Sequence, residues 1–434
     1  MAFVTFGCRL NKAEALDLEA QYAAAGWNVI DSLKFRVQSS ELTHNSQLTT
    51  HNFKPHPPDL IIVRGCSVTA KAQRDCEKAI AHLRERFPNA DLRITGCLPN
   101  KMKGKGEGEG KGEGEGEEPL TLTSNLNLQP TSRAYLKVQD GCSGKCAFCI
   151  VPQFRGAPMS VPFRDVLARA RSFLDAGFRE IILTGCNLCL YRSDGHGLPE
   201  LAAELASLES PGHRVRLGSI EPGVCDWRLI DALEAHPNIC RFLHLSLQSG
   251  SSDVLRRMRR PYTAERVAAF CEEARRRIGT RLAFGADVIA GFPGETAADH
   301  EATLEFIARQ GIVHVHAFPF SERPGTEAAE MPGALPRSTR RARAKEIAQA
   351  GEANRAAFAE ALVGSDVEVC VERDGNGRTD EGLRCILEYS SEFRVQGSGL
   401  RKAIVIATAK KYLNKSGAIF ATIRAKEQQG GKRS

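Results

Sequence analysis

Three cysteines in one short loop constrain this chain more than any other feature of its sequence. The segment GCSGKCAFC places Cys142, Cys146 and Cys149 in a Cys-x3-Cys-x2-Cys pattern. Structural zinc sites are usually closed by four ligands in paired Cys-x2-Cys form, and no histidine near this loop offers a fourth. Three thiolates instead suit a 4Fe–4S cluster that leaves one iron open to a substrate or cofactor. Phe148, directly before the last cysteine, is placed to shield such a cluster.

The compartment bears on how the 14 cysteines of the chain are used. The N-terminus MAFVTFGCRL lacks the basic leader and cleavage site of a signal peptide. No apolar stretch approaches the roughly 18 residues that a membrane span needs. We therefore expect a cytoplasmic protein with no membrane span, in which thiols stay reduced and some serve metal or redox chemistry. The alternatives are a chance cluster of loop cysteines and, for most of the remaining cysteines, simple apolar packing.

A low-complexity segment divides the sequence. Residues 103–118 read KGKGEGEGKGEGEGEE, which contains no apolar side chain and predicts a solvated, flexible linker. We therefore predict five parts: an N-terminal α/β domain at 1–102, a linker at 103–133, a core at 134–357, a small barrel at 358–426 and a disordered tail at 427–434.

Three apolar runs before the linker end in the same Gly-Cys dipeptide. The runs MAFVTFGC, DLIIVRGC and DLRITGC end at Cys8, Cys66 and Cys97, and helical periodicity follows the first two. Alternating strands and helices predict a parallel sheet, in which ligands gather beyond the carboxyl ends of the strands. The three cysteines would then converge at one rim. Three unrelated buried thiols are the alternative, and Cys76 is a possible rival ligand.

Strands and helices also alternate through the core. Strands are predicted at REIILTG, RVRLGSI, FLHLSLQ, LAFGADVIAGF and IVHVHAFPF, and helices over 161–177, 226–236, 263–278 and 296–311. This order fits a partial parallel α/β barrel, whose strand ends face the active site. Cys186 and Cys189 form a further Cys-x2-Cys pair after the first of these strands. A metal site is possible there, but packing is the simpler explanation.

The C-terminal part changes character. Short strands separated by turns predict a small antiparallel β-barrel at 358–426. The net charge of the whole chain is +7, and basic residues within the barrel segment favour contacts with phosphates over a merely solvated surface. These basic residues are Arg394, Arg401, Lys402, Lys410, Lys411 and Lys415.

The cysteine loop and the segments after it resemble the radical S-adenosylmethionine (SAM) methylthiotransferase family. The segments, in the order the family has them, are REIILTGCNLCLY, RVRLGSIEP, HLSLQSGSSDVLRRMRRPYT, GADVIAGFPGET and FPFSERPGTEAA. The resemblance implies a 4Fe–4S cluster on Cys142, Cys146 and Cys149, whose open iron binds SAM. It also implies a second 4Fe–4S cluster on the three Gly-Cys cysteines and a C-terminal RNA-binding barrel of the TRAM type. One departure is Arg64-Gly65 before the middle of these cysteines, where the family usually has Asn-Thr.

The resemblance also indicates which other residues would contact SAM or the attacked nucleotide. Polar groups at strand ends and glycines that allow close approach are the candidates, while Ser249 could equally be a turn residue and Arg323 could face a substrate phosphate. The predicted cofactor-binding residues are Phe148, Gly185, Asn187, Glu221, Gln248 and Gly291.

The activity implied by the resemblance is methylthiolation of transfer RNA. The C2–H of a modified adenosine beside the anticodon would become C2–SCH3, because a carbon radical from SAM can attack a C–H that ordinary bases cannot. The stretch FGCRLNKAEA resembles the branch that acts on N6-threonylcarbamoyladenosine. The alternatives are isopentenyladenosine in tRNA, a ribosomal-protein aspartate, or a non-catalytic cluster-containing RNA-binding protein. The expected partners are tRNA, SAM and a reductant protein.

Overall fold

The computed structural model describes residues 1–29, 58–66, 68–98, 132–372, 375–388, 404–414 and 416–423. Several sequence predictions fall outside these ranges and stay predictions: the linker up to residue 131, the tail at 427–434, and four of the basic barrel residues, Arg394, Arg401, Lys402 and Lys415. Within the described residues, no helix is both long and apolar enough to cross a membrane.

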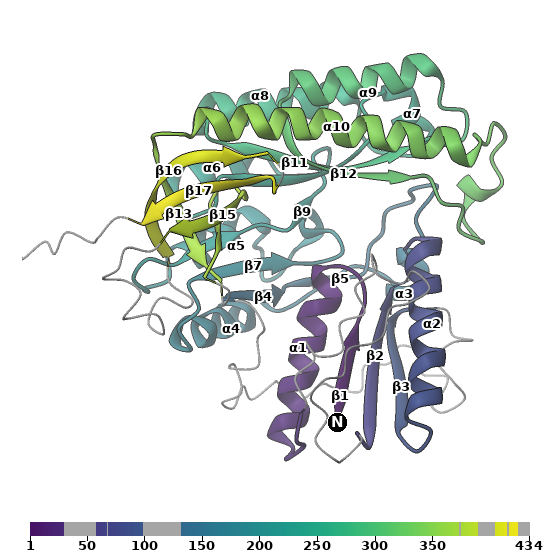
Figure 1. Cartoon of the computed structure of the whole chain (residues 1–434), viewed down its shortest axis with the longest axis vertical. Helices are drawn as coiled ribbons and strands as arrows, with labels where there is room; N and C mark the ends of the chain where they lie inside the picture. The colour runs from purple at the N-terminus through teal and green to yellow at the C-terminus, as the bar shows by residue number, and fades with distance from the viewer. Residues whose placement is uncertain are drawn as a thin grey trace, which may run out of the picture.

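The N-terminal unit is a three-stranded parallel sheet with the order β1-β2-β3 (Figure 1). Its strands are β1 (Ala2–Thr5), β2 (Leu60–Cys66) and β3 (Asp91–Cys97), and its helices are α1 (Arg9–Ala24) and α2 (Ala70–Arg86). Apolar side chains of all three strands form a core with the buried face of α2. The parallel register pairs Cys66 with Cys97, so two of the Gly-Cys cysteines end neighbouring strands side by side.

The core unit contains two parallel sheets that together make the predicted partial barrel. One has the order β4-β7-β8 and the other β12-β11-β10-β9. Their strands are β4 (Arg133–Lys137), β7 (Glu180–Thr184), β8 (Arg214–Arg216), β9 (Ser219–Ile220), β10 (Phe242–Gln248), β11 (Ala283–Ala290) and β12 (Ile312–Pro319). A short antiparallel pair, β5 (Gln139–Asp140) and β6 (Met159–Ser160), flanks the cysteine loop.

The sheet changes between β8 and β9, where the sequence predicts one continuous strand. β8 pairs with β7, whereas β9 pairs with β10. Gly218 stands between them, and a Cβ at this position would lie 2.6 Å from the carbonyl oxygen of Leu183. The chain therefore passes close over the β7 backbone as it moves from one sheet to the other, which needs glycine at that point.

Helices cover the outside of the two core sheets (Figure 1). The helices of the core unit are α3 (Val151–Arg155), which lies against β3 instead, α4 (Phe163–Asp175), α5 (Leu198–Ala206), α6 (Arg228–Ala235), α7 (Ser252–Arg257), α8 (Ala264–Ile278), α9 (Ala297–Arg309) and α10 (Arg337–Ala361), with short 3-10 turns η4 (Leu188–Leu190) and η5 (Glu327–Ala329). The sequence pattern does not reveal α10, because few of its 25 residues are buried and its apolar stripe is weak.

The C-terminal unit is a closed five-stranded barrel with the order β13-β14-β15-β17-β16. Its strands are β13 (Asp366–Val371), β14 (Gly377–Thr379), β15 (Arg384–Glu388), β16 (Ile404–Leu413) and β17 (Ala418–Ile423). All neighbours pair antiparallel except β15 and β17, which are parallel. The predicted small barrel is thus confirmed. Helix α10 runs across the predicted boundary at 357/358, and Ala359 at its end packs into the barrel core.

A buried ion cluster attaches this barrel to the core unit. Glu180 on β7 is fully buried and accepts hydrogen bonds from Arg214 (2.7 Å) and Arg216 (2.8 Å) on β8. The same two guanidinium groups donate to backbone carbonyls of the barrel at residues 368, 378, 379 and 380. Arg133 Nη1 lies 3.8 Å from Glu180 Oε1, and the same side chain pairs with Glu372, the residue that follows β13. The barrel is therefore held by directional, charge-assisted bonds.

We predict that Glu180→Gln will destabilise the fold by about 3–5 kcal/mol, because it leaves buried arginines without their counter-charge. The shift of the urea unfolding midpoint measures the loss. Burial alone would raise the pKa of Glu180, but Arg214, Arg216 and Arg133 lower it below the ordinary value of about 4.3. Its contribution should therefore be complete at neutral pH and be lost only as the solution becomes strongly acidic.

The matched control is Glu273→Gln, which removes an exposed carboxylate paired with Arg276 on the surface of α8. Exposed pairs of this kind contribute little, so the unfolding midpoint should not move measurably. Equal midpoints for Glu180→Gln and the control would show that the buried cluster does not hold the barrel in place.

Candidate active site

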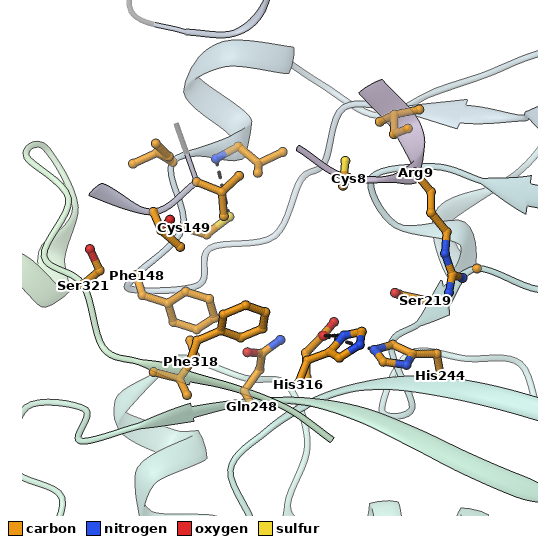
Figure 2. Close-up of a pocket in the computed structure, with 18 of the residues that line it drawn as sticks. Cys8, Arg9, Phe148, Cys149, Ser219, His244, Gln248, His316, Phe318 and Ser321 are labelled. Atoms are coloured by element: carbon orange, nitrogen blue, oxygen red, sulfur yellow. Dashed lines mark hydrogen bonds and ion pairs between the residues drawn. The ribbon is translucent and has the colours of Figure 1, made fainter. Parts of the chain in front are cut away.

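A cavity of about 490 Å³ lies between the N-terminal unit and the open side of the core sheets. The N-terminal unit supplies Cys8, Arg9, Leu10, Val68 and Thr69 to its walls, and the core supplies strand-end residues and the cysteine loop. Figure 2 shows Cys149 and Phe148 at one end of this cavity and Arg9, Ser219 and His244 at the other. The cavity therefore faces residues from both predicted cysteine sets.

The cysteine loop follows β5 and precedes α3, and its sulfur atoms accept hydrogen bonds. The Gly144 amide donates to Cys142 Sγ (3.3 Å), Arg260 Nη1 donates to Cys146 Sγ (3.0 Å), and the Val151 amide donates to Cys149 Sγ (3.4 Å). These donors favour thiolates. Burial opposes them and raises the pKa of Cys149 to about 11. A positively charged metal group would favour the thiolate forms, and its binding would release protons.

The three Gly-Cys cysteines lie at the carboxyl ends of their strands. Cys8 is exposed at the start of α1, while Cys66 and Cys97 are buried side by side. Gly7 has a φ of 104°, and a Cβ there would lie 2.8 Å from Cys66 Cβ, so the first strand end approaches the second closely. Burial and the neighbouring sulfurs of Cys8 and Cys97 raise the pKa of Cys66 to about 11.

The departure at Arg64-Gly65 has a local explanation. A Cβ on Gly65 would lie 2.0 Å from a side-chain carbon of Leu98, so the buried Leu98 occupies the space that a larger residue would fill. Arg64 makes an ion pair with Glu14 of α1. Behind this strand, the buried Cys76 Sγ accepts a hydrogen bond from the Cys66 amide (3.3 Å), so its thiol is occupied by backbone.

The spacing of the sulfur atoms tests which metal group could fit. Among the described residues, the only three potential metal ligands whose atoms all lie within 4.8 Å of one another are His244, Asp287 and His316. Neither cysteine set meets this limit. A single tetrahedral zinc ion with Zn–S bonds of about 2.3 Å would hold its sulfurs about 3.8 Å apart. Both sets are therefore too wide for one zinc ion, and their thiol chemistry fits a larger iron–sulfur cluster.

A polar network lies beside the cysteine loop and joins two of the predicted cofactor-binding residues. Arg260 Nη2 lies 2.7 Å from Glu221 Oε1, and Asn187 Nδ2 donates to the other oxygen of Glu221 at 2.5 Å. Arg260 is also the residue that donates to Cys146 Sγ. Glu221 and Asn187 thus connect to the cysteine loop through one guanidinium group, which the sequence analysis does not identify.

Three other predicted residues line the cavity directly. Phe148 and Gly185 belong to its wall, and so does Gln248 at the end of β10. Gln248 has a φ of 68°, a left-handed conformation that is costly outside glycine, and the strand register shifts just before it. Strained residues of this kind concentrate at functional sites. The prediction that Gln248 contacts a ligand therefore gains a structural reason.

The remaining candidates lie outside the cavity wall. The Gly291 amide donates to the carboxylate of Glu295 (3.0 Å), and a Cβ on Gly291 would collide with Arg340. Ser249 is buried and its hydroxyl lies 3.3 Å from that of Thr303, as expected of a turn residue. Arg323 is buried and donates to Gln73 of α2 (2.5 Å), so it connects the core to the N-terminal unit.

The Cys-x2-Cys pair also separates into two environments. Cys186 Sγ lies 3.3 Å from Asp140 Oδ1, and burial raises the pKa of this thiol. Cys189 is buried against Cys225 and accepts a hydrogen bond from the Glu221 amide (3.3 Å). These contacts agree with packing.

Arg155 is the junction between the two cysteine sets. It lies at the end of α3, six residues after Cys149, and its Nε donates to Cys97 Sγ at 2.9 Å. Its Nη atoms bind Glu14 (2.7 Å) and Asn11 (2.7 Å) on α1. One side chain of the core unit thus bonds both to the rim of the N-terminal sheet and to the helix that follows Cys8.

The cavity also contains residues that the sequence analysis misses. His244 Nε2 and His316 Nδ1 both approach Asp287 Oδ1, at 3.1 and 3.2 Å, from neighbouring strands β10, β11 and β12. Asp287 and His316 stand near strand ends of a parallel barrel, which is a recognisable signal. Arg9 directly follows Cys8, and its position beside a predicted ligand is the signal that could have identified it.

These features define a class. A parallel partial barrel with a three-cysteine loop at its open side is the arrangement of radical SAM enzymes, and residues 136–307 match the family described as the Radical SAM superfamily. The fold also resembles the radical S-adenosylmethionine methyltransferase TsrM from Kitasatospora setae. That similarity has a TM-score of 0.51, 13% sequence identity and coverage of 76% of each chain.

Relatives identify the family within this class. The chain is 30% identical to the threonylcarbamoyladenosine tRNA methylthiotransferase MtaB of Rickettsia prowazekii, over 87% of this chain and 89% of the relative. It is 32% identical to the protein of the same name from Chlamydia pneumoniae, over 85% and 86%. A tRNA-2-methylthio-N(6)-dimethylallyladenosine synthase of Cereibacter sphaeroides is also 32% identical, over 86% and 87%. The chain belongs to the radical SAM tRNA methylthiotransferase family and is an enzyme of this kind.

We predict that replacing Cys142, Cys146 or Cys149 with Ala will abolish formation of 5′-deoxyadenosine from SAM. The two remaining thiolates cannot hold a cluster with one open iron. Anaerobically reconstituted, reduced protein is assayed by chromatography of the nucleoside products. Cys271→Ala, which changes a buried thiol of α8, is the matched control and should retain cleavage. Cleavage at the wild-type rate by any of the three loop variants would exclude this site.

We also predict that replacing Cys8, Cys66 and Cys97 together will remove roughly half of the bound iron, since each set should hold one cluster. SAM cleavage should survive, while methylthiolation should stop. Iron content and both reactions are measured on the same preparation. Full methylthiolation by the triple variant would show that these cysteines are not ligands.

Proposed function

We propose that this enzyme methylthiolates C2 of N6-threonylcarbamoyladenosine beside the anticodon of tRNA, using two 4Fe–4S clusters and SAM. The observation that carries the proposal is the cavity of about 490 Å³ whose walls contain both Cys8 and Cys149. A reaction that first generates a carbon radical and then attaches sulfur needs one nucleotide within reach of both cysteine sets. This single cavity offers that arrangement.

The chemistry divides between the cofactors and the chain. When bound, the clusters and SAM supply the electron, the 5′-deoxyadenosyl radical and the methylthio group. The chain supplies position and exclusion of water. Phe148 packs edge-on against the buried Phe292 at a centroid distance of 6.5 Å, and Phe292 packs in turn on Phe320. This apolar wall keeps water from the end of the cavity beside Cys149.

Arg260 and Arg155 would each stabilise one set of ligands. Arg260 donates to Cys146 Sγ, and Arg155 donates to Cys97 Sγ. Charge-assisted bonds to sulfur favour the electron-rich state of a thiolate-bound cluster, and they fix the sulfur positions. Arg260 also holds Glu221, so the same guanidinium places a carboxylate beside the proposed SAM site.

The choice of modified adenosine rests on the character of the cavity, because the relatives do not decide it. Proteins named for threonylcarbamoyladenosine and for dimethylallyladenosine are equally similar to this chain. The end of the cavity away from Cys149 is polar and contains Arg9, Ser219 and His244. A threonylcarbamoyl group is polar and carries a carboxylate, whereas an isopentenyl group would leave these side chains unpaired.

The C-terminal barrel would hold the tRNA through its phosphates. Lys410 and Lys411 are exposed on β16 of the barrel. Phosphate contacts position RNA without reading its sequence, so the base would be chosen in the cavity. The attachment of the barrel through Arg214 and Arg216 would keep the distance between the barrel and the cavity fixed.

We predict that a mixture of the two tRNA substrates will yield mainly methylthiolated threonylcarbamoyladenosine. Reconstituted enzyme receives both tRNAs in one reaction, and nucleosides from the digested RNA are measured by mass spectrometry. The discrimination should exceed about 100-fold, since buried polar groups reject an apolar analogue strongly.

The same experiment separates the alternatives. A dominant isopentenyladenosine product would overturn the proposed substrate but leave the enzyme class intact. Modification of a ribosomal protein without any thiolated nucleoside would overturn the proposal that the substrate is tRNA. The Cys142→Ala protein is the control, because it should bind RNA and form neither product.

A further inference from the structure

Arg9 is a cation in the cavity wall that the described residues do not neutralise. It is the first residue of α1, and its side chain is exposed to the cavity. Within the part of the chain that the structure describes, its side chain makes no ion pair and donates no hydrogen bond, whereas Asn11 and Glu14 of the same helix are both engaged. Its guanidinium therefore has donors left for a ligand.

The surroundings of Arg9 disfavour its positive charge. The pKa of Arg9 is lowered, mainly because the cavity walls reduce its hydration and also by repulsion from Arg216 and Arg133. Glu180, whose charge favours the Arg9 cation, already serves three arginines of the barrel attachment. Helix α1 begins here without a side-chain cap and without an acidic residue in its first turn. An anion at this end of the cavity would stabilise both the Arg9 cation and the start of helix α1.

The direction of the side chain decides which anion Arg9 can meet. Figure 2 shows it running from the helix toward Ser219 and His244, away from Cys8. It therefore does not point at the cysteine set beside which it stands in the sequence. Ser219 is an exposed strand residue whose hydroxyl faces the same space, and His316 lies next to His244, with ring centroids 5.0 Å apart.

The Asp287 carboxylate cannot take the role of that anion. Hydrogen bonds from His244 and His316, together with their charges, hold the pKa of Asp287 below its ordinary value despite its burial. Both contacts go to the same Oδ1 atom, so the carboxylate is committed to orienting the two imidazole rings. The two rings and the hydroxyl of Ser219 add further polar atoms to this end of the cavity.

We infer that Arg9 binds the carboxylate of the N6 substituent of the substrate nucleotide, with Ser219 and the His244–His316 pair completing a carboxylate-binding subsite. This inference rests on the proposed function. In adenine, C2 and the N6 atom are separated by the N1 edge of the ring. A base whose C2 lies between Cys8 and Cys149 can therefore extend its N6 arm along the cavity to Arg9.

The test compares anticodon stem-loops that carry threonylcarbamoyladenosine or the same nucleotide with a carboxamide in place of the carboxylate. The two differ in charge and hardly in size. Wild-type enzyme should show a KM for the acid roughly 10- to 100-fold lower than for the amide, as expected for a hydrogen-bonded charge pair. Arg9→Gln should raise the KM for the acid to that for the amide, and Arg9→Lys should restore part of the difference, because lysine keeps the charge without the planar fork.

Two further measurements show whether the variant protein is intact. Iron content and SAM cleavage without RNA should match wild type in Arg9→Gln, although Arg9 adjoins Cys8. Arg256→Gln is the matched control, since it removes an exposed arginine of α7 that pairs with the nearby Asp253. It should keep the wild-type ratio of KM values. Binding of each stem-loop by fluorescence anisotropy repeats the comparison without turnover.

The outcomes separate the inference from the proposed function. Methylthiolation of the acid with equal KM values for acid and amide in the wild type would overturn the carboxylate subsite and leave the proposed function standing. An unchanged acid-to-amide ratio in Arg9→Gln with wild-type iron would also overturn the role of Arg9. If Arg9→Gln loses iron, the acid-to-amide ratios of KM in the wild type and in Arg9→Lys test the carboxylate subsite instead. No product from either stem-loop, with activity on isopentenyladenosine, would overturn both.

Discussion

The bonds made by Arg155 set the geometry on which the rest of the site depends. This residue ends α3, the helix that directly follows the three-cysteine loop, so its backbone position is tied to that loop. Its guanidinium reaches Cys97 Sγ and two residues of α1, the helix that starts next to Cys8. Few other side chains could connect these three places, because only arginine offers five donors in a planar fork.

The charge balance around Arg155 explains why such a buried cluster persists. Glu14 also pairs with Arg64 and lies 2.8 Å from Lys137 Nζ, and Asp140 lies 2.7 Å from the same ammonium. Two carboxylates thus face three cations, and the surplus positive charge lies at the rim where thiolates are expected. Removing one member would leave a buried charge unpaired, which costs far more than a surface pair contributes. The cluster therefore attaches the two units strongly only when it is complete.

Much of the fold could be predicted from the sequence because its signals are local. The strand runs ending in Gly-Cys and the helices at 163–175 and 264–278 show clear apolar periodicity, and they form as expected. The break between β8 and β9 could not be predicted, because it goes with a close approach of Gly218 to the β7 backbone that only tertiary structure reveals. Helix α10 was hidden for a related reason, since its packing uses alanines and a glycine against Val315 rather than a strong apolar stripe.

The candidate site divides in the same way. Cysteines at motif spacing can be read from the chain, and so can the strand-end position of Gln248. Arg260 and Arg155 act through contacts across 114 and 58 residues of sequence, and nothing local marks them as partners of sulfur. For Arg9, the neighbour in sequence is misleading. It directly follows Cys8, but its side chain points toward Ser219 and His244.

The arrangement of the cavity separates chemistry from recognition. Aromatic side chains surround the end beside Cys149, where, under the proposed function, a reactive carbon radical would need protection from water. Polar side chains occupy the opposite end, where a substituent can be held without exposing the reacting carbon. The two kinds of relative are named for adenosines that differ in their substituent, threonylcarbamoyl in one and dimethylallyl in the other. Under the proposed function, substrate choice would change through residues such as Arg9, while the cysteine loop and its supporting arginines stay the same.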